Sequence, residues 1–186
     1  LTAYRNLSKL IGKSFNSSSN LSPISRSALE GEIEFKNVSF KFEGSKQPTI
    51  NNISFKIPAG QKVALVGKMG SGKSTMSKLI AGMLEPTSGA ILIDGIDVRQ
   101  IDPADVRKNI GVMLQDSWLF SGTVRENIQM GFNEYDDDHV LEICKIAGVD
   151  DFVGSHPKGY DLEIRERGIG LSGGQKQTIN LARSLI

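Results

Sequence analysis

The chain has 186 residues, of which 39% are hydrophobic and 23% are charged, a composition typical of a globular domain with a real core. Its formal net charge of +1 gives no reason to expect nucleic acid or an anionic membrane surface as a partner. Cys144 is the only cysteine, which excludes an internal disulfide, and no apolar run approaches the roughly 18–20 residues that cross a bilayer.

The N-terminal residues precede the predicted folded domain. Apolar residues recur at helical spacing over residues 1–12, which predicts the end of a longer helix. Residues 13–30 are rich in Ser and Asn and lack an apolar period, so we interpret them as a linker. The domain then extends over residues 31–186. Because the sequence starts at Leu1 and stops within an apolar helical pattern, we expect a fragment of a longer protein.

Several apolar runs predict β-strands. Apolar residues alternate from Ile33 to Phe42, and the alternation slips at Asn37, as a β-bulge would cause. Other runs predict strands over residues 50–57, 62–66, 90–93 and 110–114. We expect the strand over residues 62–66 to be buried, because it is short, continuous and rich in β-branched residues.

Helical patterns alternate with these strands. Four helices are predicted, with these apolar positions: Met76, Leu79, Ile80 and Met83, ended by Pro86; a short helix opened by Asp102 and Pro103; Val140, Leu141, Cys144 and Ala147, ended by Gly148; and Ile179, Leu181, Ala182 and Leu185. Thr123 and Glu126 also have the spacing of a helix-capping box. Strands and helices mixed in this way predict an α/β fold.

A glycine-rich loop lies between the strand over residues 62–66 and the helix that follows. Its sequence, Gly67-Lys68-Met69-Gly70-Ser71-Gly72-Lys73-Ser74-Thr75, fits the phosphate-binding pattern G-x-x-x-x-G-K-[ST]. The alternative is a glycine turn with a surface lysine. The predicted strand before the loop and helix after it favour phosphate binding.

The residue types in this loop suit a triphosphate. Glycines allow positive φ and keep Cβ atoms away from an anion, while successive N–H groups point inward at the positive end of a helix. We expect Lys73 to reach the outer phosphates of ATP and the Ser74 hydroxyl to bind Mg²⁺. The loop therefore predicts ATP and Mg²⁺ as cofactors.

A second glycine-rich segment precedes the last predicted helix. It reads Leu171-Ser172-Gly173-Gly174-Gln175, and a serine with two glycines at a helix N-terminus is a potential anion site. Alone, the pentapeptide would be no more than an N-capped helix.

Taken together, these segments resemble the nucleotide-binding domain of ABC transporters over roughly residues 31–186. The resemblance implies a P-loop NTPase of the ABC ATPase type, with an antiparallel β subdomain and a helical subdomain that carries the LSGGQ signature. In that family two such domains pair head to tail, and the signature of one copy closes over the ATP bound by the loop of the other. The implied partners are a second nucleotide-binding domain, in a homodimer, and a transmembrane domain of the same chain, with no nucleic acid.

The resemblance also assigns roles to individual residues. Phe42 matches the aromatic that stacks on adenine, although a plain core position is the alternative. Gln115 matches the glutamine that contacts Mg²⁺ and the attacking water. Residues of the signature match those that contact the partner's γ-phosphate: Ser172, Gly173, Gly174 and Gln175. The implied catalytic residues are thus Lys73, Gln115 and Ser172, and the implied metal ligands are Ser74 and Gln115.

Finer features resemble the exporter branch. Residues 117–128 look like the exporter form of the glutamine loop, and residues 166–168 like the loop with which exporters touch their transmembrane helices. Residues 94–97, 102–105 and 156–161 are similar to type I secretion exporters of Gram-negative bacteria, which move repeat-containing adhesins and toxins. That branch implies a periplasmic adaptor, an outer-membrane channel, and a place at the cytoplasmic face of the inner membrane.

The resemblance places an Asp-Glu strand and a histidine, both needed for hydrolysis, beyond Ile186. We therefore expect the full-length protein to be an ATPase and this chain alone to be inactive. The alternatives are a lipid, peptide or drug exporter, a non-catalytic nucleotide-binding half-site, and a soluble ABC ATPase acting on DNA or ribosomes. The last is disfavoured by the neutral charge and by the absence of a coiled coil between loop and signature.

Overall fold

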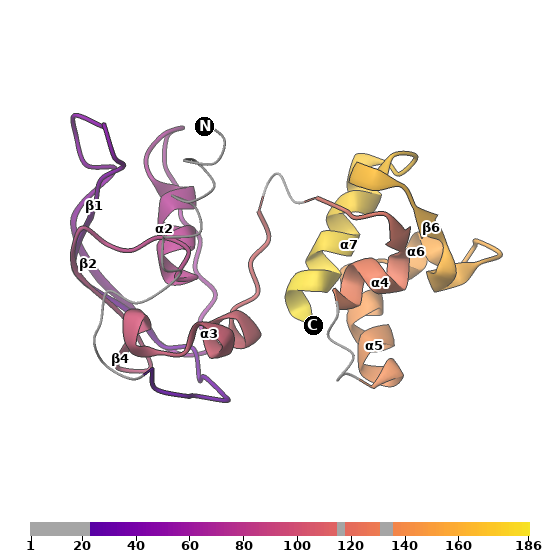
Figure 1. Cartoon of the computed structure of the whole chain (residues 1–186), viewed down its shortest axis with the longest axis horizontal. Helices are drawn as coiled ribbons and strands as arrows, with labels where there is room; N and C mark the ends of the chain where they lie inside the picture. The colour runs from indigo at the N-terminus through magenta and orange to yellow at the C-terminus, as the bar shows by residue number, and fades with distance from the viewer. Residues whose placement is uncertain (1–22, 115–117, 131–135) are drawn as a thin grey trace, which may run out of the picture. The chain divides into compact units, whose positions relative to one another are not determined.

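The computed structural model describes residues 23–114, 118–130 and 136–186. The chain divides into two compact units, residues 1–109 and residues 110–186, which are drawn in Figure 1 and described separately below. The predicted helix over residues 1–12 lies outside the described residues, as do Gln115 and most of the predicted linker.

Unit 1 is built on an antiparallel sheet. Its strands pair in the order β2-β1-β3-β4, which places the N-terminal strand inside the sheet. Their bounds are β1 Ile33–Phe40, β2 Ile50–Ile57, β3 Ser88–Ile93 and β4 Ile96–Asp97. The predicted strands over residues 50–57 and 90–93 are therefore confirmed, and the antiparallel sheet matches the β subdomain that the resemblance implies.

The predicted slip in the first strand is a β-bulge. The pairing of β1 with β2 shifts register between Phe35 and Val38, and Asn37 adopts a φ of 49°. The backbone N–H of Asn37 donates to Ser54 Oγ at 2.8 Å, which satisfies a group that the bulge removes from the ladder. Phe35 and Val38 are both buried, so the bulge keeps both apolar residues on the core side.

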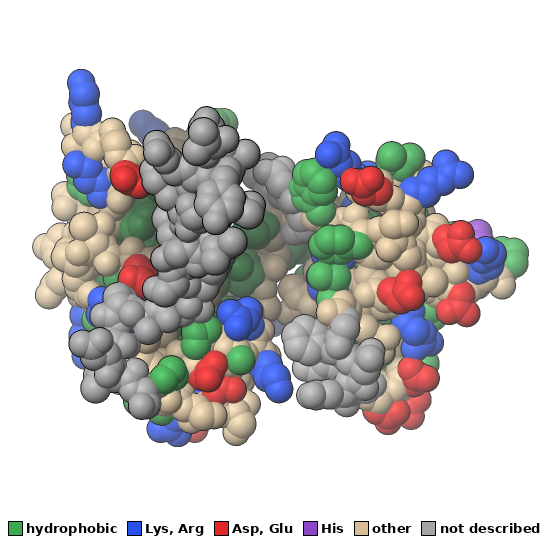
Figure 2. Space-filling model, in the orientation of Figure 1, with side chains coloured by type: hydrophobic (Ala, Val, Ile, Leu, Met, Phe, Trp, Pro, Cys, Tyr) green, Lys and Arg blue, Asp and Glu red, His purple; other side chains and the backbone are tan. Residues whose placement is uncertain are grey.

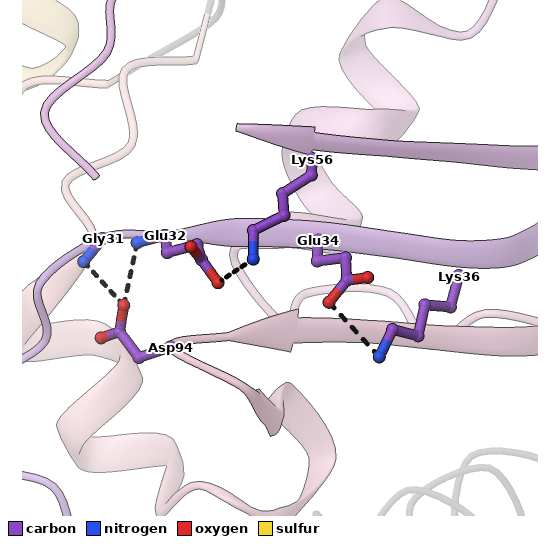
Figure 3. Close-up of polar contacts among 6 residues, drawn as sticks. All are labelled: Gly31, Glu32, Glu34, Lys36, Lys56 and Asp94. Atoms are coloured by element: carbon purple, nitrogen blue, oxygen red, sulfur yellow. Dashed lines mark hydrogen bonds and ion pairs between the residues drawn. The ribbon is translucent and has the colours of Figure 1, made fainter. Parts of the chain in front are cut away.

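Polar contacts fix the start of β1 (Figure 3). Asp94 Oδ1 accepts hydrogen bonds from the backbone N–H groups of Gly31, at 3.1 Å, and Glu32, at 2.9 Å. Lys56 lies 2.7 Å from Glu32, and this hydrogen bond raises the pKa of Lys56. Lys36 pairs with Glu34 at 3.3 Å. Because these ion pairs are solvent-exposed, they add little to stability.

Part of the predicted linker is bound to helix α3 (Pro103–Asn109) and the residues just before it. Ile24 forms an isolated parallel bridge with Ile101. The Asp105 carboxylate accepts from the Ser25 hydroxyl at 3.0 Å and from the Arg26 N–H at 2.7 Å. These contacts show that residues 24–26 run along unit 1.

The remaining elements of unit 1 complete its core. Helix α2 spans Lys73–Ile80 and lies beside the sheet (Figure 1), and the 3-10 helix η1 spans Val98–Gln100. The buried apolar side chains are Phe35, Val38, Phe40, Ile50, Met76, Leu79, Ile91, Ile93, Val98, Ile101 and Val106. Asp102 opens α3 as predicted, since its Oδ1 accepts from the Ala104 N–H at 2.7 Å.

Two expectations for unit 1 are wrong. Residues 62–66 form no strand, and Val66 is 94% exposed. A strand needs neighbours for its backbone N–H and C=O groups, and no described strand pairs with this run. Helix α2 ends at Ile80, before Pro86, and Met83 is half-exposed, because the chain leaves the helix through a left-handed residue, Gly82.

Unit 2 is mainly helical. Its elements are the paired strands β5 (Gly122–Thr123) and β6 (Glu163–Ile164), the helices α4 (Val124–Gln129), α5 (Asp137–Ala147), α6 (Asp150–Val153) and α7 (Gly173–Leu185), and the 3-10 helices η2 (Gly159–Asp161) and η3 (Glu166–Gly168). One core unites them, formed by Leu119, Val124, Ile128, Val140, Ile143, Cys144, Ala147, Val149, Val153, Ile164, Ile179 and Ala182.

The helix ends of unit 2 follow the sequence closely. Thr123 and Glu126 form the predicted capping box on α4, and Gly148 ends α5 with a φ of 78°. The predicted apolar faces of the helices are wrong in part. Leu141, Leu181 and Leu185 are exposed, and Ile143, which was not predicted, is buried. The predicted strand over residues 110–114 is also absent, as no described strand pairs with it.

No helix among the described residues is long and apolar enough to cross a membrane. On the face shown in Figure 2, basic and acidic side chains of the described residues are interspersed over both units.

Cys144 provides a test of the core of unit 2. Burial, together with the nearby Asp150, raises the pKa of the Cys144 thiol to about 11. At pH 8 we expect iodoacetamide to label the folded chain about 100-fold more slowly than the denatured chain, since two pKa units reduce the thiolate fraction about 100-fold. A Ser155→Cys variant, with an exposed thiol, should react at the ordinary rate.

The same shift predicts a pH dependence of stability. Between about pH 9 and pH 11 the unfolded chain loses the Cys144 proton while the folded chain keeps it, so the free energy of unfolding should fall as pH rises. Rapid labelling of folded Cys144 at pH 8, with no fall in stability over that range, would show that this core is open to solvent.

Candidate nucleotide-binding site

The glycine-rich loop of unit 1 joins a left-handed turn to the start of α2. Gly70 and Gly72 have φ values of 80° and 91°, and Gly72 is the N-cap of α2. The first hydrogen bond of the helix runs from the Met76 N–H to the Gly72 carbonyl at 2.9 Å, so the earlier N–H groups have no helical acceptor. The first turn contains no acidic residue, which leaves its positive end uncompensated.

Gly72 is required by its surroundings as well as by its backbone. A Cβ atom there would lie 2.6 Å from Ile50 Cδ1 and 3.1 Å from the Thr49 carbonyl oxygen. At Gly67 a Cβ atom would lie 2.7 Å from Ser71 Oγ. The loop therefore packs directly on the start of β2, and this contact fixes the position from which α2 begins.

Lys73 folds back across the loop. Its Nζ donates to the carbonyl oxygens of Gly67 and Lys68, both at 2.9 Å, and lies 3.4 Å from Ser71 Oγ. The ammonium group is thus held against the backbone of the loop that leads into α2. A cation and unpaired N–H groups in one place form a site for a polyanion such as a triphosphate.

The remaining loop residues point mainly to solvent. Ser74 is exposed at the first turn of α2, where its hydroxyl is free to approach a metal ion bound to a phosphate. Thr75 is buried at 8% exposure and belongs to the packing of α2, whereas Met69 is fully exposed. A hard oxygen ligand beside a phosphate site suits Mg²⁺, so Ser74 fits the predicted role. The other predicted ligand, Gln115, lies outside the described residues.

Phe42 lies in the same unit as the loop. Phe42 is 44% exposed, and its ring stands nearly perpendicular to the ring of Phe40, with centroids 4.7 Å apart. The Phe40 carbonyl accepts from the Thr49 N–H at 2.8 Å, and Thr49 is the residue that packs on Gly72. The turn that carries Phe42 is thereby tied to the phosphate loop, and the exposed ring is available for stacking on a base.

The signature segment forms the start of α7 in unit 2. Ser172 and Gln175 form a capping box: the Gln175 N–H donates to Ser172 Oγ at 3.2 Å, and the Ser172 N–H donates to Gln175 Oε1 at 2.8 Å. Because the Ser172 hydroxyl accepts one bond here, its proton remains available to an outside acceptor. A Cβ atom at Gly173 would meet nothing within 4 Å, so the approach to this helix end is open.

The sequence analysis does not identify a polar cluster that the structure shows within residues 118–127 and at Arg183. Asn127 is 2% exposed, and its side chain binds both the N–H and the carbonyl of Phe120. Arg183, on α7, donates to the carbonyls of Asn127 at 2.7 Å and Trp118 at 2.9 Å. The signal in the sequence is Asn127, a polar residue that lies between the apolar residues Val124 and Ile128 of α4.

The predicted site residues thus fall into two groups. Phe42 and residues 67–75 belong to unit 1, whereas residues 172–175 belong to unit 2. Within unit 1 the structure brings the phosphate loop and the turn of Phe42 together through Thr49.

Comparisons with known proteins point to one family. The sequence profile described as "ABC transporter" matches residues 50–186. The chain is 44% identical over 155 residues to YgaD of Bacillus subtilis, and 42% identical over 154 residues to SAB1799c of Staphylococcus aureus. Both relatives are named for multidrug export, as ATP-binding/permease proteins.

A solved structure is also similar. It is described as a bacterial Atm1-family ABC exporter with ATP bound, and the match has a TM-score of 0.86 at 34% identity, covering 99% of this chain and 32% of that one. The alignments with YgaD and SAB1799c each cover 83% of this chain. The chain spans only about a quarter (27%) of the length of those two relatives.

The geometry at Gly72 predicts a difference between two substitutions. Gly72→Ala should lower the free energy of unfolding of unit 1 by about 2–4 kcal/mol, because it adds left-handed strain and a clash with Ile50. Gly70→Ala meets nothing within 4 Å and should cost only the strain, about 1–2 kcal/mol. Urea denaturation compares them, and equal losses would contradict the packing of the loop on β2.

Proposed function

Since the chain belongs to the ABC transporter family, as its nucleotide-binding domain of the exporter type, we propose that it binds MgATP at the loop of residues 67–75. The observation that carries this proposal is that Lys73 Nζ donates, at 2.9 Å, to two carbonyls of the loop that leads into the uncapped start of α2. Phe42 stacks on the adenine, and Ser74 with Gln115 holds Mg²⁺.

The signature completes the site from a second copy of the chain. Ser172 offers a hydroxyl proton, Gly173 leaves the approach open, and the N-terminus of α7 adds its dipole. These groups suit the γ-phosphate of an ATP molecule bound by the partner copy. Closing two copies around two ATP molecules is then the step that drives transport.

Catalysis follows from the same arrangement. Lys73 and Ser172 stabilise the charge that develops on the γ-phosphoryl group, and Gln115 orients the attacking water. Hydrolysis also requires the Asp-Glu strand that the resemblance places after α7. We therefore propose ATP hydrolysis for the longer protein and ATP binding without turnover for this chain.

A drug is the best-supported cargo. The names of YgaD and SAB1799c point to drug export, which favours that alternative over protein secretion and over the adaptor and outer-membrane channel that secretion would need. We place the domain at the cytoplasmic face of a membrane, next to a transmembrane domain that residues 1–12 would join to it. Stimulation of ATP hydrolysis in the longer protein by drugs would support drug export, and stimulation by a secreted protein instead would support protein secretion.

Replacement of the loop lysine tests nucleotide binding. Lys73→Ala should weaken ATP binding about 10–100-fold, because charge-assisted hydrogen bonds contribute about 1.5–3 kcal/mol. Isothermal titration calorimetry of the 186-residue chain measures the affinity. Lys78→Ala, on the same helix and with the same loss of charge, serves as the control and should bind ATP normally. Equal affinities for the two variants would refute the assignment of the phosphate site.

An arginine at the signature tests pairing. Ser172→Arg should leave ATP binding by single copies unchanged and prevent ATP-dependent pairing, because its long side chain fills the open approach at Gly173. Light scattering with and without ATP detects the pairs, and Ser155→Arg, at an exposed turn of the same unit, is the control. Loss of ATP binding in monomeric Ser172→Arg would instead assign the signature to the site of its own chain.

A further inference from the structure

The last turn of α7 contacts the chain on both sides of the segment that contains Gln115. Arg183 donates from Nη1 to the carbonyl oxygen of Trp118 at 2.9 Å. On the other side, the Ser184 carbonyl occupies the space where a side chain at Gly111 would lie. In the sequence, Gly111 and Trp118 flank Gln115. The helix that begins at the signature therefore ends against both flanks of the predicted glutamine loop.

Arg183 also ties Trp118 to helix α4. Its Nε donates to the Asn127 carbonyl at 2.7 Å, and its Nη2 donates to Asn127 Oδ1 at 3.2 Å. The side chain of Asn127 in turn binds the backbone of Phe120, accepting from the N–H at 2.8 Å and donating to the carbonyl at 2.9 Å. The planar guanidinium thus spans Trp118 and Asn127 at once, which a lysine ammonium has no fork to reproduce.

A second arginine holds the same segment from another direction. The Cζ atom of Arg167 lies 4.4 Å from the centroid of the Trp118 ring, and the Arg167 N–H donates to the Leu119 carbonyl at 3.0 Å. Burial lowers the pKa of Arg183, and the acceptors around its guanidinium offset the cost of burying that charge. Although Trp118 is 54% exposed, residues 118–119 are therefore held by backbone hydrogen bonds to α7 and to η3.

We propose that Arg183 is a positioning residue that fixes residues 118–120 to the signature helix α7, so that the two move as one body. Arg183 is not among the predicted nucleotide-binding residues. It carries a displacement of α7 to the segment that follows Gln115. The purpose of this displacement, to move Gln115 when the signature closes over ATP, rests on the proposed function. The attachment of residues 118–120 to α7 does not.

The single tryptophan of the chain makes this inference measurable, since all tryptophan fluorescence comes from Trp118. Acrylamide quenching of the nucleotide-free chain compares the wild type with Arg183→Gln and Arg183→Lys, at a temperature where circular dichroism shows each to be folded. Arg107→Gln is the control, because Arg107 is an exposed arginine of unit 1.

Arg183→Gln should raise the quenching constant up to about twofold, since Trp118 is 54% exposed and its full release would nearly double the accessible area of the residue. Arg183→Lys should give an intermediate value, and Arg107→Gln should equal the wild type. A purely structural role would lower the melting temperature of Arg183→Gln and leave the quenching of its folded state unchanged, which would overturn the proposal.

If Arg183→Gln does not fold, Arg183→Lys decides the question. Lysine keeps the charge and the aliphatic stem and loses only the fork, so an increase in quenching supports positioning and a wild-type value overturns it. Because the measurement uses no nucleotide, it is independent of the proposed function. A chain that fails to bind ATP refutes that function and leaves this result standing.

Discussion

The contact between Gly72 and the first residues of β2 is the constraint on which the candidate site depends. Gly72 lacks a side chain where Ile50 and Thr49 approach, and its left-handed backbone turns the loop into helix α2. The sheet thereby determines where the helix begins. The unpaired N–H groups and Lys73 are then fixed relative to the rest of unit 1, before any anion arrives, and preorganised charge of this kind binds more strongly than mobile charge.

Unit 2 uses a helix start in a different way. The capping box of Ser172 and Gln175 satisfies two N–H groups that an anion would otherwise bind, yet leaves the serine proton available. The other end of the same helix is anchored by Arg183 to Trp118. One helix therefore connects the signature, which we propose contacts a partner's phosphate, with the chain that follows Gln115. In our account this connection couples the closing of the signature to the position of Gln115.

Turns, bulges and helix caps are easier to predict from this sequence than the burial of side chains. The slip at Asn37, the capping box at Thr123 and the stop at Gly148 were all predicted, because each depends on neighbouring residues alone. Residues 62–66 were predicted as a buried strand, but a strand depends on partners far away in the sequence, and the described chain provides none. The roles of Asn127 and Thr49 likewise come from tertiary contacts, which no periodic pattern records.

Backbone amide shifts measure the central claim most directly. In ¹⁵N-labelled chain, MgATP should shift the N–H signals of residues 70–75 strongly, whereas adenosine, which lacks the phosphates, should leave them nearly unchanged. Signals of the signature should respond only where copies pair. If MgATP left residues 70–75 unshifted, or if adenosine shifted them equally, the loop would not be a phosphate site and the account would be wrong.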